Sequence, residues 1–527
     1  MKYLYHRPDF FYFYTLMFKS IDALKLFLAK LSKLSYNRIY IFRKKGDYME
    51  HKKMDRDLKT RHISMIAIGG SIGTGLFMAS GAVVAQAGPG GALLAYAIIG
   101  IMIYFLMTAL GELATFYPVS GAFNAYASRF IDPAAGFTVG WFYWIIWSLV
   151  TSVDILSAAK VLSYWEMFGG IHPFIWSLIF LALIFMLNAF SVKSFGEAEY
   201  WFSIIKVATI FLFLIMGLLL IFGIIGGEPI GFKNFTIGDA PFHNGIFGLL
   251  GVLIVAGFSF GGTEVVAVTA GESKNPSESM PKAIKQVFWR ILLFYIGSIF
   301  IIACIIPYTD PQLINENSDV SMSPFTIVFD KVGILFAASV MNAVILTAVL
   351  SAGNSGLYAT SRLLLSLSQD NKAPKFLGKL NKNNMPFNAL IVTTAFVILT
   401  LIYANINTGG YFKLLNMVGS LILIVWLISI ISHMRLRYAI KKQNKDINKL
   451  LAYKAPLFPL GPVIVICTII FLLVGQSFGD IKAMNIIKMI ESYIPIVIAI
   501  ISYFGYKLVK RTKIIKLEDI NLEKHTL

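Results

Sequence analysis

Residues 69–75 read GGSIGTG, between the apolar runs MIAI (65–68) and LFMA (76–79). Four of these seven residues are glycine, and each glycine costs a helix interior roughly 1 kcal/mol relative to alanine. In the core of a bilayer, an unpaired backbone group costs several kcal/mol more. A helix that breaks here must therefore give its freed backbone groups another partner.

The rest of the chain predicts an all-α polytopic membrane protein. Its 527 residues are 57% hydrophobic and 14% charged, whereas soluble proteins carry about a quarter charged residues. The mean hydropathy is +0.71. Apolar runs long enough to cross a bilayer predict about twelve spans, numbered here 1 to 12, at approximately 63–87, 89–117, 133–162, 172–191, 197–226, 244–271, 282–306, 332–368, 388–404, 411–438, 459–476 and 493–510. Both cysteines, Cys304 and Cys467, lie in such runs and predict neither a disulfide framework nor a metal site.

The distribution of the basic residues argues against nucleic-acid binding, although the net charge is +18. Lysine and arginine gather at alternate connections between spans, around residues 52–61, 274–290, 372–382, 435–449 and 507–516. The intervening connections are poor in both residue types. This alternation is the positive-inside pattern, and it places both termini in the cytoplasm.

The N-terminal segment, residues 1–48, stands apart from the predicted bundle. It is aromatic and basic, but it lacks both a full-length span and the cleavage site of a signal peptide. We expect either a loosely held extension, an interfacial helix or a native start at Met49. The predicted organisation is then a cytoplasmic lead-in (49–62), a first group of five helices (63–226), a second group (244–438), helices 11 and 12 (459–510) and a cytoplasmic tail (511–527).

A second interruption lies inside span 6, where residues 257–264 read GFSFGGTE. The two interruptions are five spans apart, so a second copy of a five-helix repeat enters the membrane from the opposite side. Matching glycine-interrupted spans in two halves are typical of transporters built from inverted repeats. We therefore predict a 5+5 inverted repeat, with spans 11 and 12 appended.

Backbone groups freed by such breaks have opposite partial charges. A half-helix that begins near Gly75 offers free N–H groups and a positive dipole end, which favour an anion. The half-helix that ends at the break offers carbonyls, which favour a cation. An α-amino acid carries both groups. The alternative is that these glycines only allow close helix packing.

Several longer stretches resemble the amino-acid permeases of the APC superfamily, in its bacterial amino-acid transporter branch. They are GGSIGTGLF (69–77), AGPGGALLAYAIIGIMIYFLMTALGELATFYPVSG (87–121) and GFSFGGTEVVAVTAGES (257–273). The resemblance runs from about residue 61 to about 510. FGEAEYWFSIIKV (195–207), QVFWRILLFY (286–295) and VMNAVILTAVLSAGNSGLYATSR (340–362) bring it closer to the permeases that are specific for lysine.

The resemblance implies a LeuT-like fold and a set of substrate-binding residues. Backbone N–H groups of Thr74 and Gly75 would hold the substrate carboxylate, with Ser71 and Gly73 shaping the turn. Carbonyls of Ser71, Phe258 and Gly261 would accept from the α-ammonium group, and Phe258 and Phe260 would either close over the substrate or pack in the core. Ser259 and Gly262 complete this candidate set.

Two charged residues inside spans are candidates for recognition and coupling, since each costs at least about 2.5–3.5 kcal/mol at the bilayer centre. Asp154, in span 3, would pair with the ε-ammonium of lysine, or else be held by Ser152, Ser157 or Lys160. Lys206, in span 5, resembles the lysine that replaces a sodium ion in proton-coupled relatives. Burial favours loss of its proton, and the alternative is a static buried cation.

Two glutamates are candidates for gating or proton coupling. Glu264 follows the break in span 6 and would link substrate occupancy to gating, or serve only as a hydrogen-bonding group. Glu112 ends span 2, where we expect a gate or a helix-end contact and no direct contact with substrate.

The sequence thus predicts a secondary carrier of the bacterial cytoplasmic membrane that imports L-lysine by proton symport with alternating access. No cofactor, nucleotide-binding loop or cluster of catalytic side chains is predicted, so an enzyme is not expected. A permease for arginine or ornithine, and an exchanger of lysine for its decarboxylation product cadaverine, remain open. So does a lysine sensor that restrains a membrane regulator, although the loops identify no protein partner.

Overall fold

The structure is a computed structural model that describes residues 72–119, 122–190, 193–269, 276–313, 322–333, 336–381, 385–407, 409–476 and 486–523. The chain divides into two units, residues 1–55 and 56–527, and all described residues belong to the second. The predicted N-terminal extension, the lead-in, the first part of span 1 and Ser71 lie outside the described residues.

Regular structure in the described residues is helical throughout. Eight of the helices are long and apolar enough to cross a membrane, and three shorter apolar helices supplement them. One of the eight, Gly75–Phe116, consists of η1 (Gly75–Ala79) and α3 (Ser80–Phe116) and is bent at Gly88, whose φ is 75° and ψ 173°. Since Pro89 follows the bend, this run forms the end of span 1 and all of span 2. The prediction of a helical polytopic fold is confirmed.

The remaining spans follow in the predicted order: α5 (Pro133–Leu162), α7 (Pro173–Phe190), α8 (Lys193–Ile221), α9 (Gly245–Ser259) with α10 (Val265–Thr269), α11 (Pro276–Arg290) with η4 (Ile291–Ile296) and α12 (Gly297–Ile305), α14 (Ala337–Gln369), α15 (Phe387–Ile406), α16 (Gly410–Lys442), α18 (Leu460–Gly475) and α20 (Ile486–Lys510). Short helices that the hydropathy pattern did not predict are α4 (Ala122–Phe130), α6 (Glu166–Gly169), α13 (Pro324–Lys331) and α17 (Ile447–Leu450), with 3₁₀ turns η2 (Lys233–Phe235) and η5 (Lys375–Gly378). They are too short or too polar to register as spans.

Helix α5 is anchored at its first turn. Asp132 caps it, since its Oδ1 accepts the Ala135 N–H at 2.7 Å, and Pro133 occupies the first helical position. The other carboxylate oxygen of Asp132 accepts from Tyr503 at 2.9 Å and from Lys507 at 3.0 Å, both on α20. One buried carboxylate therefore ties span 12 to the start of span 3.

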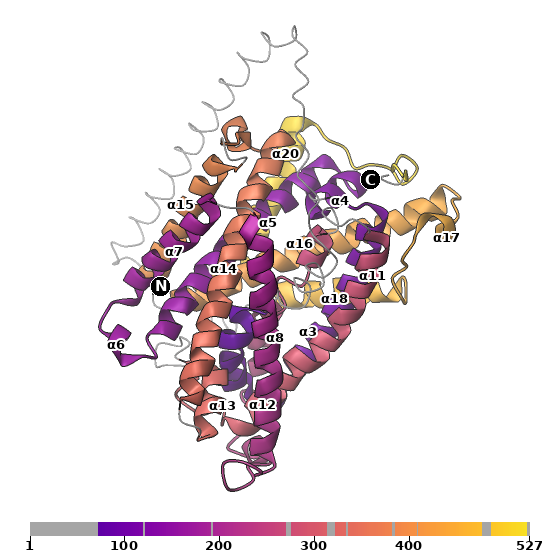
Figure 1. The fold of residues 1–527 in the computed structure, drawn as a ribbon. Coiled ribbons are helices and arrows are strands. Elements are labelled where there is room, and N and C mark those ends of the chain that lie inside the picture. Colours follow the sequence, from indigo (N-terminus) through magenta and orange to yellow (C-terminus); the bar gives the residue numbers. More distant parts are fainter. Residues whose placement is uncertain are drawn as a thin grey trace, which may run out of the picture. The chain divides into compact units, whose positions relative to one another are not determined.

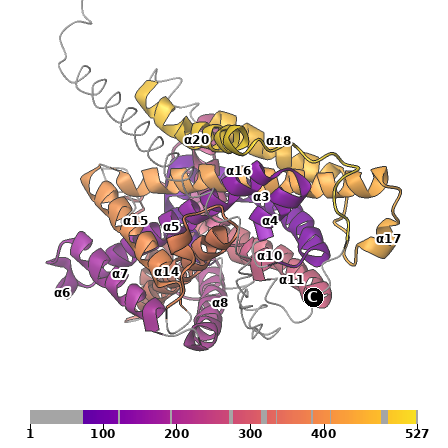
Figure 2. The same cartoon turned by 90° about the horizontal axis from the view of Figure 1, so that it is seen from above.

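Two sets of packed helices meet at the centre of the bundle (Figure 1). Helix α5 packs against α14, α16 and α7, whereas α3 packs against α9, α11 and α12. Helices α18 and α20 lie alongside α16 (Figure 2). Helices η1 and α9 also contact each other, so the two glycine-rich stretches lie side by side at the centre of the bundle.

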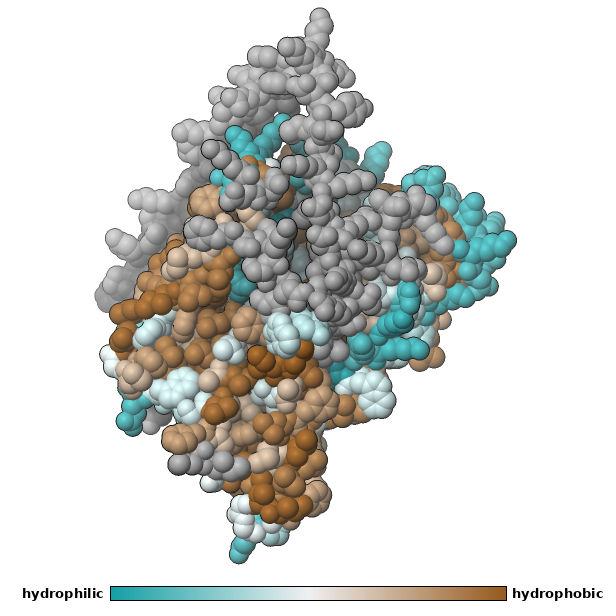
Figure 3. Space-filling model, viewed as in Figure 1, coloured by the Kyte–Doolittle hydropathy of each residue, from teal (hydrophilic) through white to brown (hydrophobic). Residues whose placement is uncertain are grey.

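Large apolar side chains are exposed along many helices, including Leu183, Phe211, Ile215, Val474 and Ile501. Figure 3 shows apolar side chains spread over much of one face, with hydrophilic ones gathered toward the end near α17. A soluble protein rarely leaves apolar patches of this extent in water. Lipid contact explains them, and the protein is a multi-pass membrane protein.

The C-terminal tail packs against α4 and the end of α16. The Ile515 N–H donates to the Ile131 carbonyl at 2.9 Å, and Gln443 donates to the Ile520 carbonyl at 2.8 Å. Arg129 of α4 donates to the Asn521 carbonyl at 2.9 Å. Because Ile520 is only 2% exposed, this part of the tail belongs to the folded body of the protein.

Candidate functional site

The first glycine-rich stretch is described from Ile72 onward. The helix begins at Gly75, and Thr74 occupies its N-cap position. The Phe77 N–H donates to the Gly73 carbonyl at 3.1 Å, while the N–H groups of the first turn of any helix lack intrahelical partners. Gly75 and the four residues after it are all buried. The structure thus places a helix N-terminus inside the protein where the sequence predicted one.

The second glycine-rich stretch interrupts span 6. Helix α9 ends at Ser259, residues 260–264 form turns, and α10 begins at Val265. The Gly261 N–H donates to the Phe258 carbonyl at 2.8 Å, and Gly262 has a φ of +89°, which favours glycine. The predicted break in span 6 is confirmed.

The two stretches touch directly. Ser259 Oγ donates to the Gly75 carbonyl at 2.9 Å, and the Tyr96 hydroxyl lies 2.8 Å from the same Oγ. A Cβ atom added to Gly75 would lie 2.4 Å from the Ser259 Cα atom. Only glycine allows this approach, so Gly75 has a packing role in addition to the backbone role that the sequence predicted.

A cavity of about 40 Å³ lies against these breaks. That space holds about three water molecules, so the lining side chains must move apart to admit an amino acid. Its lining contains eight of the nine predicted substrate-binding residues, namely Gly73, Thr74, Gly75, Asp154, Phe258, Ser259, Gly261 and Gly262, together with Glu264. Ser71, the ninth, is outside the described residues.

Two buried carboxylates face this cavity. Asp154, on α5, is 2% exposed, and its Oδ1 accepts from Thr74 Oγ1 at 2.6 Å. Glu264 is fully buried, and its Oε2 accepts the Gly262 N–H at 3.1 Å. The other oxygens, Asp154 Oδ2 and Glu264 Oε1, have no hydrogen-bond partner among the described residues. A buried carboxylate without compensation is costly, so both oxygens are suited to a cation or a proton.

The local partners that the sequence offered for Asp154 are engaged elsewhere. Ser152 Oγ donates to the Ser148 carbonyl at 3.0 Å, and Ser157 Oγ lies 3.0 Å from the Tyr411 hydroxyl. Lys160 Nζ lies 4.4 Å from the centre of the Tyr411 ring. The hydrogen-bond partner of Asp154 in the described residues is therefore Thr74, from another span.

Each of these carboxylates interacts electrostatically with one buried basic side chain. Lys206 on α8 is 1% exposed and acts electrostatically on Asp154. Arg290 at the end of α11 is 2% exposed and acts in the same way on Glu264. The positive charge near Glu264 was not predicted, although the arginine is visible in the sequence inside an apolar run. The structure thus places one basic side chain near each carboxylate.

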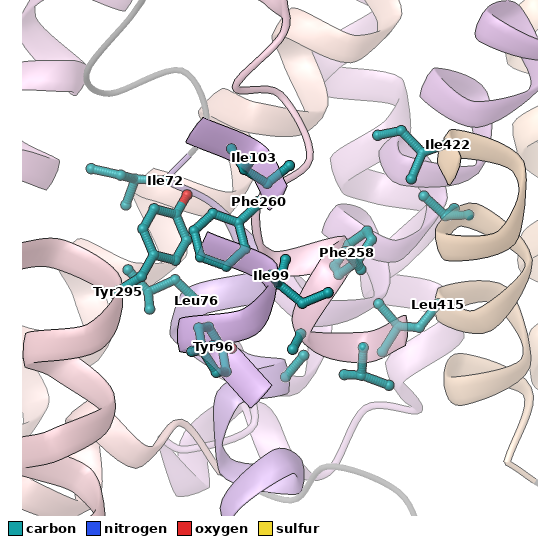
Figure 4. Close-up of a cluster of buried hydrophobic side chains, with 14 of the residues drawn as sticks. Ile72, Leu76, Tyr96, Ile99, Ile103, Phe258, Phe260, Tyr295, Leu415 and Ile422 are labelled. Atoms are coloured by element: carbon teal, nitrogen blue, oxygen red, sulfur yellow. The ribbon is translucent and has the colours of Figure 1, made fainter. Parts of the chain in front are cut away.

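The structure separates the two phenylalanines for which the sequence left both a substrate role and a packing role open. The Phe260 ring is fully buried and stacks on Tyr295, with ring centroids 4.2 Å apart. Figure 4 shows Phe260 beside Tyr295, while Phe258 lies across the break toward Leu415 and Ile422. Only Phe258 lines the cavity. Residues two positions apart at a broken helix end point in different directions, which the sequence alone does not resolve.

Glu112 lies in a separate cluster and does not line the cavity. Arg437 of α16 donates to both of its carboxylate oxygens at 2.6 Å, and the Ala455 N–H donates to Oε2 at 2.7 Å. His433 Nε2 lies 3.1 Å from Oε1. Glu112 and His433 are fully buried. Glu112, at the end of span 2, thus contacts span 10 and the connection that follows span 10.

The sequence analysis missed the apolar part of the cavity lining: Ile146, Trp147, Val150, Ala352, Val418 and Ile422. The residues on α5 were within reach of sequence reasoning, because Trp147 and Val150 precede Asp154 by seven and four positions and share a helix face with it. The others come from α14 and α16, and no local pattern connects them with Asp154.

Broken helices that meet at a buried cavity, within a bundle of about twelve apolar spans, define a membrane carrier of the inverted-repeat type. A family model for amino acid permeases matches residues 62–518. The chain belongs to this family.

Curated relatives cover nearly the whole chain. It is 49% identical over 470 residues to the lysine-specific permease LysP of Escherichia coli, covering 88% of this chain and 96% of that protein. It is 46% identical over 506 residues to LysP of Lactococcus lactis, covering 95% and 99%. The histidine permease HisP of the same organism is 46% identical over 473 residues, covering 90% and 98%.

Proposed function

We propose that this protein is a secondary carrier that imports L-lysine together with a proton across the bacterial cytoplasmic membrane. The observation that carries this proposal is the cavity at the two helix breaks, which is lined by two buried carboxylates. Each carboxylate keeps one oxygen without a partner among the described residues. A zwitterion with an additional ammonium group matches a site with a helix N-terminus and two anionic groups. The names of the two LysP relatives support the same substrate.

The backbone at the breaks binds the part that all amino acids share. The N–H groups of Thr74 and Gly75, at the positive end of the half-helix, receive the substrate carboxylate. The carbonyls of Phe258 and Gly261 receive the α-ammonium group. The Phe258 carbonyl already accepts the Gly261 N–H, but a carbonyl oxygen has two lone pairs, so one remains for the substrate.

Helix α5 binds the side chain of the substrate. Trp147, Val150 and Asp154 line the cavity from one helix face. The four residues from Val150 to Asp154 rise about 6 Å along the helix, which is comparable with an extended lysine side chain. The methylene groups pack on the apolar residues, and the ε-ammonium group pairs with Asp154 Oδ2.

Lys206 and Glu264 couple this occupancy to proton movement. Lys206 is buried and electrostatically linked to Asp154, so the charge state of one residue affects the other. Glu264 sits at the break in span 6 and is linked to Arg290. Spans 1, 2, 6 and 7 rock against spans 3, 4, 5, 8, 9 and 10, the two groups of five being inverted repeats. Both termini are cytoplasmic, which places Glu112 and Arg437 as a contact of the cytoplasmic gate.

The test is uptake by the purified full-length protein in proteoliposomes with an acidic exterior. We expect radiolabelled lysine to accumulate only while the pH gradient persists, and a protonophore to abolish accumulation. Competition with arginine, ornithine, histidine and cadaverine at equal concentration defines the substrate range, and empty liposomes give the background. Accumulation of another amino acid in preference to lysine overturns the assignment of substrate. Uptake that requires internal cadaverine, and persists with the protonophore, overturns symport in favour of exchange.

A further inference from the structure

Thr74 stands at the start of the half-helix with helical dihedral angles, φ −53° and ψ −35°, and its side chain does not cap that helix. A capping threonine has non-helical dihedral angles and accepts a hydrogen bond from an N–H group of the first turn through its hydroxyl. Here the side chain makes no capping hydrogen bond. Its hydroxyl donates instead to Asp154 Oδ1 at 2.6 Å, a residue 80 positions away on α5. Helix capping therefore does not explain the hydroxyl.

This hydrogen bond fixes how Asp154 presents its carboxylate. Thr74 and Asp154 are 1% and 2% exposed, so water does not compete for the bond. With Oδ1 engaged, Oδ2 is the oxygen without a partner among the described residues. Helix α14 approaches the base of this side chain, since a Cβ atom added to Gly353 would be 3.4 Å from the Asp154 Cβ atom. The hydrogen bond to Thr74 is therefore the described contact that orients the carboxylate.

Lys206 is the competing partner for the same carboxylate. It is buried on α8 and acts electrostatically on Asp154. Without the Thr74 hydroxyl, no side-chain hydrogen bond among the described residues holds the carboxylate, and the positive charge of Lys206 would influence its orientation. Asp154 would then no longer present a fixed oxygen to a cationic substrate side chain.

We propose that Thr74 is a positioning residue: its hydroxyl holds Asp154 toward the cavity and thereby selects substrates that carry a cationic side chain. This inference rests on the proposed function, in which Asp154 binds the ε-ammonium group of lysine. It is distinct from the role of the Thr74 N–H group, which serves the carboxylate that all amino acids share. Loss of the hydroxyl therefore affects lysine selectively.

The experiment compares lysine with norleucine, which has the same chain length and lacks the ε-ammonium group. In proteoliposomes containing the full-length protein, the KM for lysine and the inhibition constant for norleucine are measured for Thr74→Val and Thr74→Ser. We expect Thr74→Val to raise the lysine KM at least tenfold, with the norleucine constant within about twofold of wild type. Thr74→Ser keeps the hydroxyl and stays within about threefold of wild type for both.

Thr108→Val is the matched control, because Thr108 is also buried and its hydroxyl donates to a carbonyl of its own helix, at 2.8 Å. If Thr74→Val does not fold, Thr74→Ala replaces it, and we expect the same rise in the lysine KM. The proposal is overturned if Thr74→Val behaves like the control, or if lysine and norleucine are weakened equally. Asp154→Asn distinguishes a failure of the proposed function from a failure of this inference. If Asp154→Asn leaves the lysine KM unchanged, the proposed role of Asp154 is wrong. If Asp154→Asn raises the lysine KM but Thr74→Val does not, only the proposed role of Thr74 is wrong.

Discussion

Ser259 Oγ lies 2.9 Å from the carbonyl oxygen of Gly75. Ser259 is the last residue of α9 in span 6, and Gly75 is the first residue of η1 in span 1. The contact joins residues 184 positions apart, in the two glycine-rich stretches. The hydroxyl of Tyr96, in span 2, lies 2.8 Å from the same Ser259 Oγ. Spans 1, 2 and 6 thus contact one another at the level of the cavity.

Gly75→Ala tests this close approach. The added Cβ atom would lie 2.4 Å from the backbone of Ser259, so the two breaks must separate. We expect lysine uptake below about a tenth of wild type and a lower Tm, since overpacking costs about 1–3 kcal/mol. Gly251→Ala on α9 is the control, because its added Cβ atom would meet no described atom within 4 Å and the residue does not line the cavity. Equal uptake by the two variants would contradict the packing role.

Asp154→Asn tests the recognition of the substrate side chain. Hydrogen bonds to a charged group contribute about 1.5–3 kcal/mol, so the lysine KM rises roughly 10- to 100-fold. Inhibition by norleucine is expected to change little. Ser157→Ala, on the same helix and bonded to Tyr411, gives the effect of a buried change away from the cavity. If the lysine KM and the norleucine inhibition constant rise by the same factor, Asp154 supports the fold and does not bind the substrate side chain.

Lys206→Met tests proton coupling. Methionine keeps much of the apolar volume of lysine but carries no proton, so the variant should lose accumulation driven by a pH gradient. Exchange of labelled for unlabelled lysine, which needs no net proton movement, should continue. Both are measured in the same proteoliposomes, with Lys233→Met at an exposed position as control. Retained gradient-driven accumulation would remove Lys206 from the coupling mechanism.

Glu112→Gln tests the cluster at the end of span 2. Removing one partner of a buried ion pair costs about 3–5 kcal/mol, because Arg437 is left without its charged partner. A lower Tm of the purified protein is expected. Glu518→Gln breaks the pair with Lys442, in which both side chains are exposed and the atoms are 3.4 Å apart, and should change stability by less than about 1 kcal/mol. Similar melting of the two variants would refute a stabilising role for Glu112.

Asp239, in the connection between α8 and α9, predicts a local effect of pH. Its carboxylate accepts from the Tyr308 hydroxyl and contacts His243, and these interactions lower its pKa from 3.8 to about 2. A lowered pKa means that this loop is stabilised above pH 4 and loses the stabilisation as the pH falls toward 2. Hydrogen exchange at the Asn244 N–H, which donates to Asp239 Oδ2, should therefore show reduced protection below pH 4. Asp239→Asn should abolish that dependence, whereas Asp310→Asn should preserve it.

Much of the fold was readable from local composition. Apolar runs predicted the spans, and glycine clusters predicted that the helix begins near Gly75 and that span 6 breaks before Val265. The same clusters supplied most of the candidate site, because residues that must leave a helix in a bilayer are glycines and small polar side chains. Their proposed roles in binding stay predictions.

Contacts between spans that are distant in the sequence could not be predicted from it. Helix α5 is apolar or small around most of its circumference and is buried in the bundle, so its sequence does not say which face meets the cavity. The partnership of Glu112 with Arg437 joins residues 325 positions apart. Phe258 and Phe260 are two residues apart and lie in different environments.

The sequence by itself determined that the chain spans a membrane many times, where the helices break and which residue types lie at the breaks, because hydropathy and glycine content act locally. Only the tertiary structure decided that Thr74 reaches Asp154, that Gly75 touches Ser259 and that Phe260 is buried away from the cavity. These outcomes depend on the rotation and packing of whole helices, which many side chains set together.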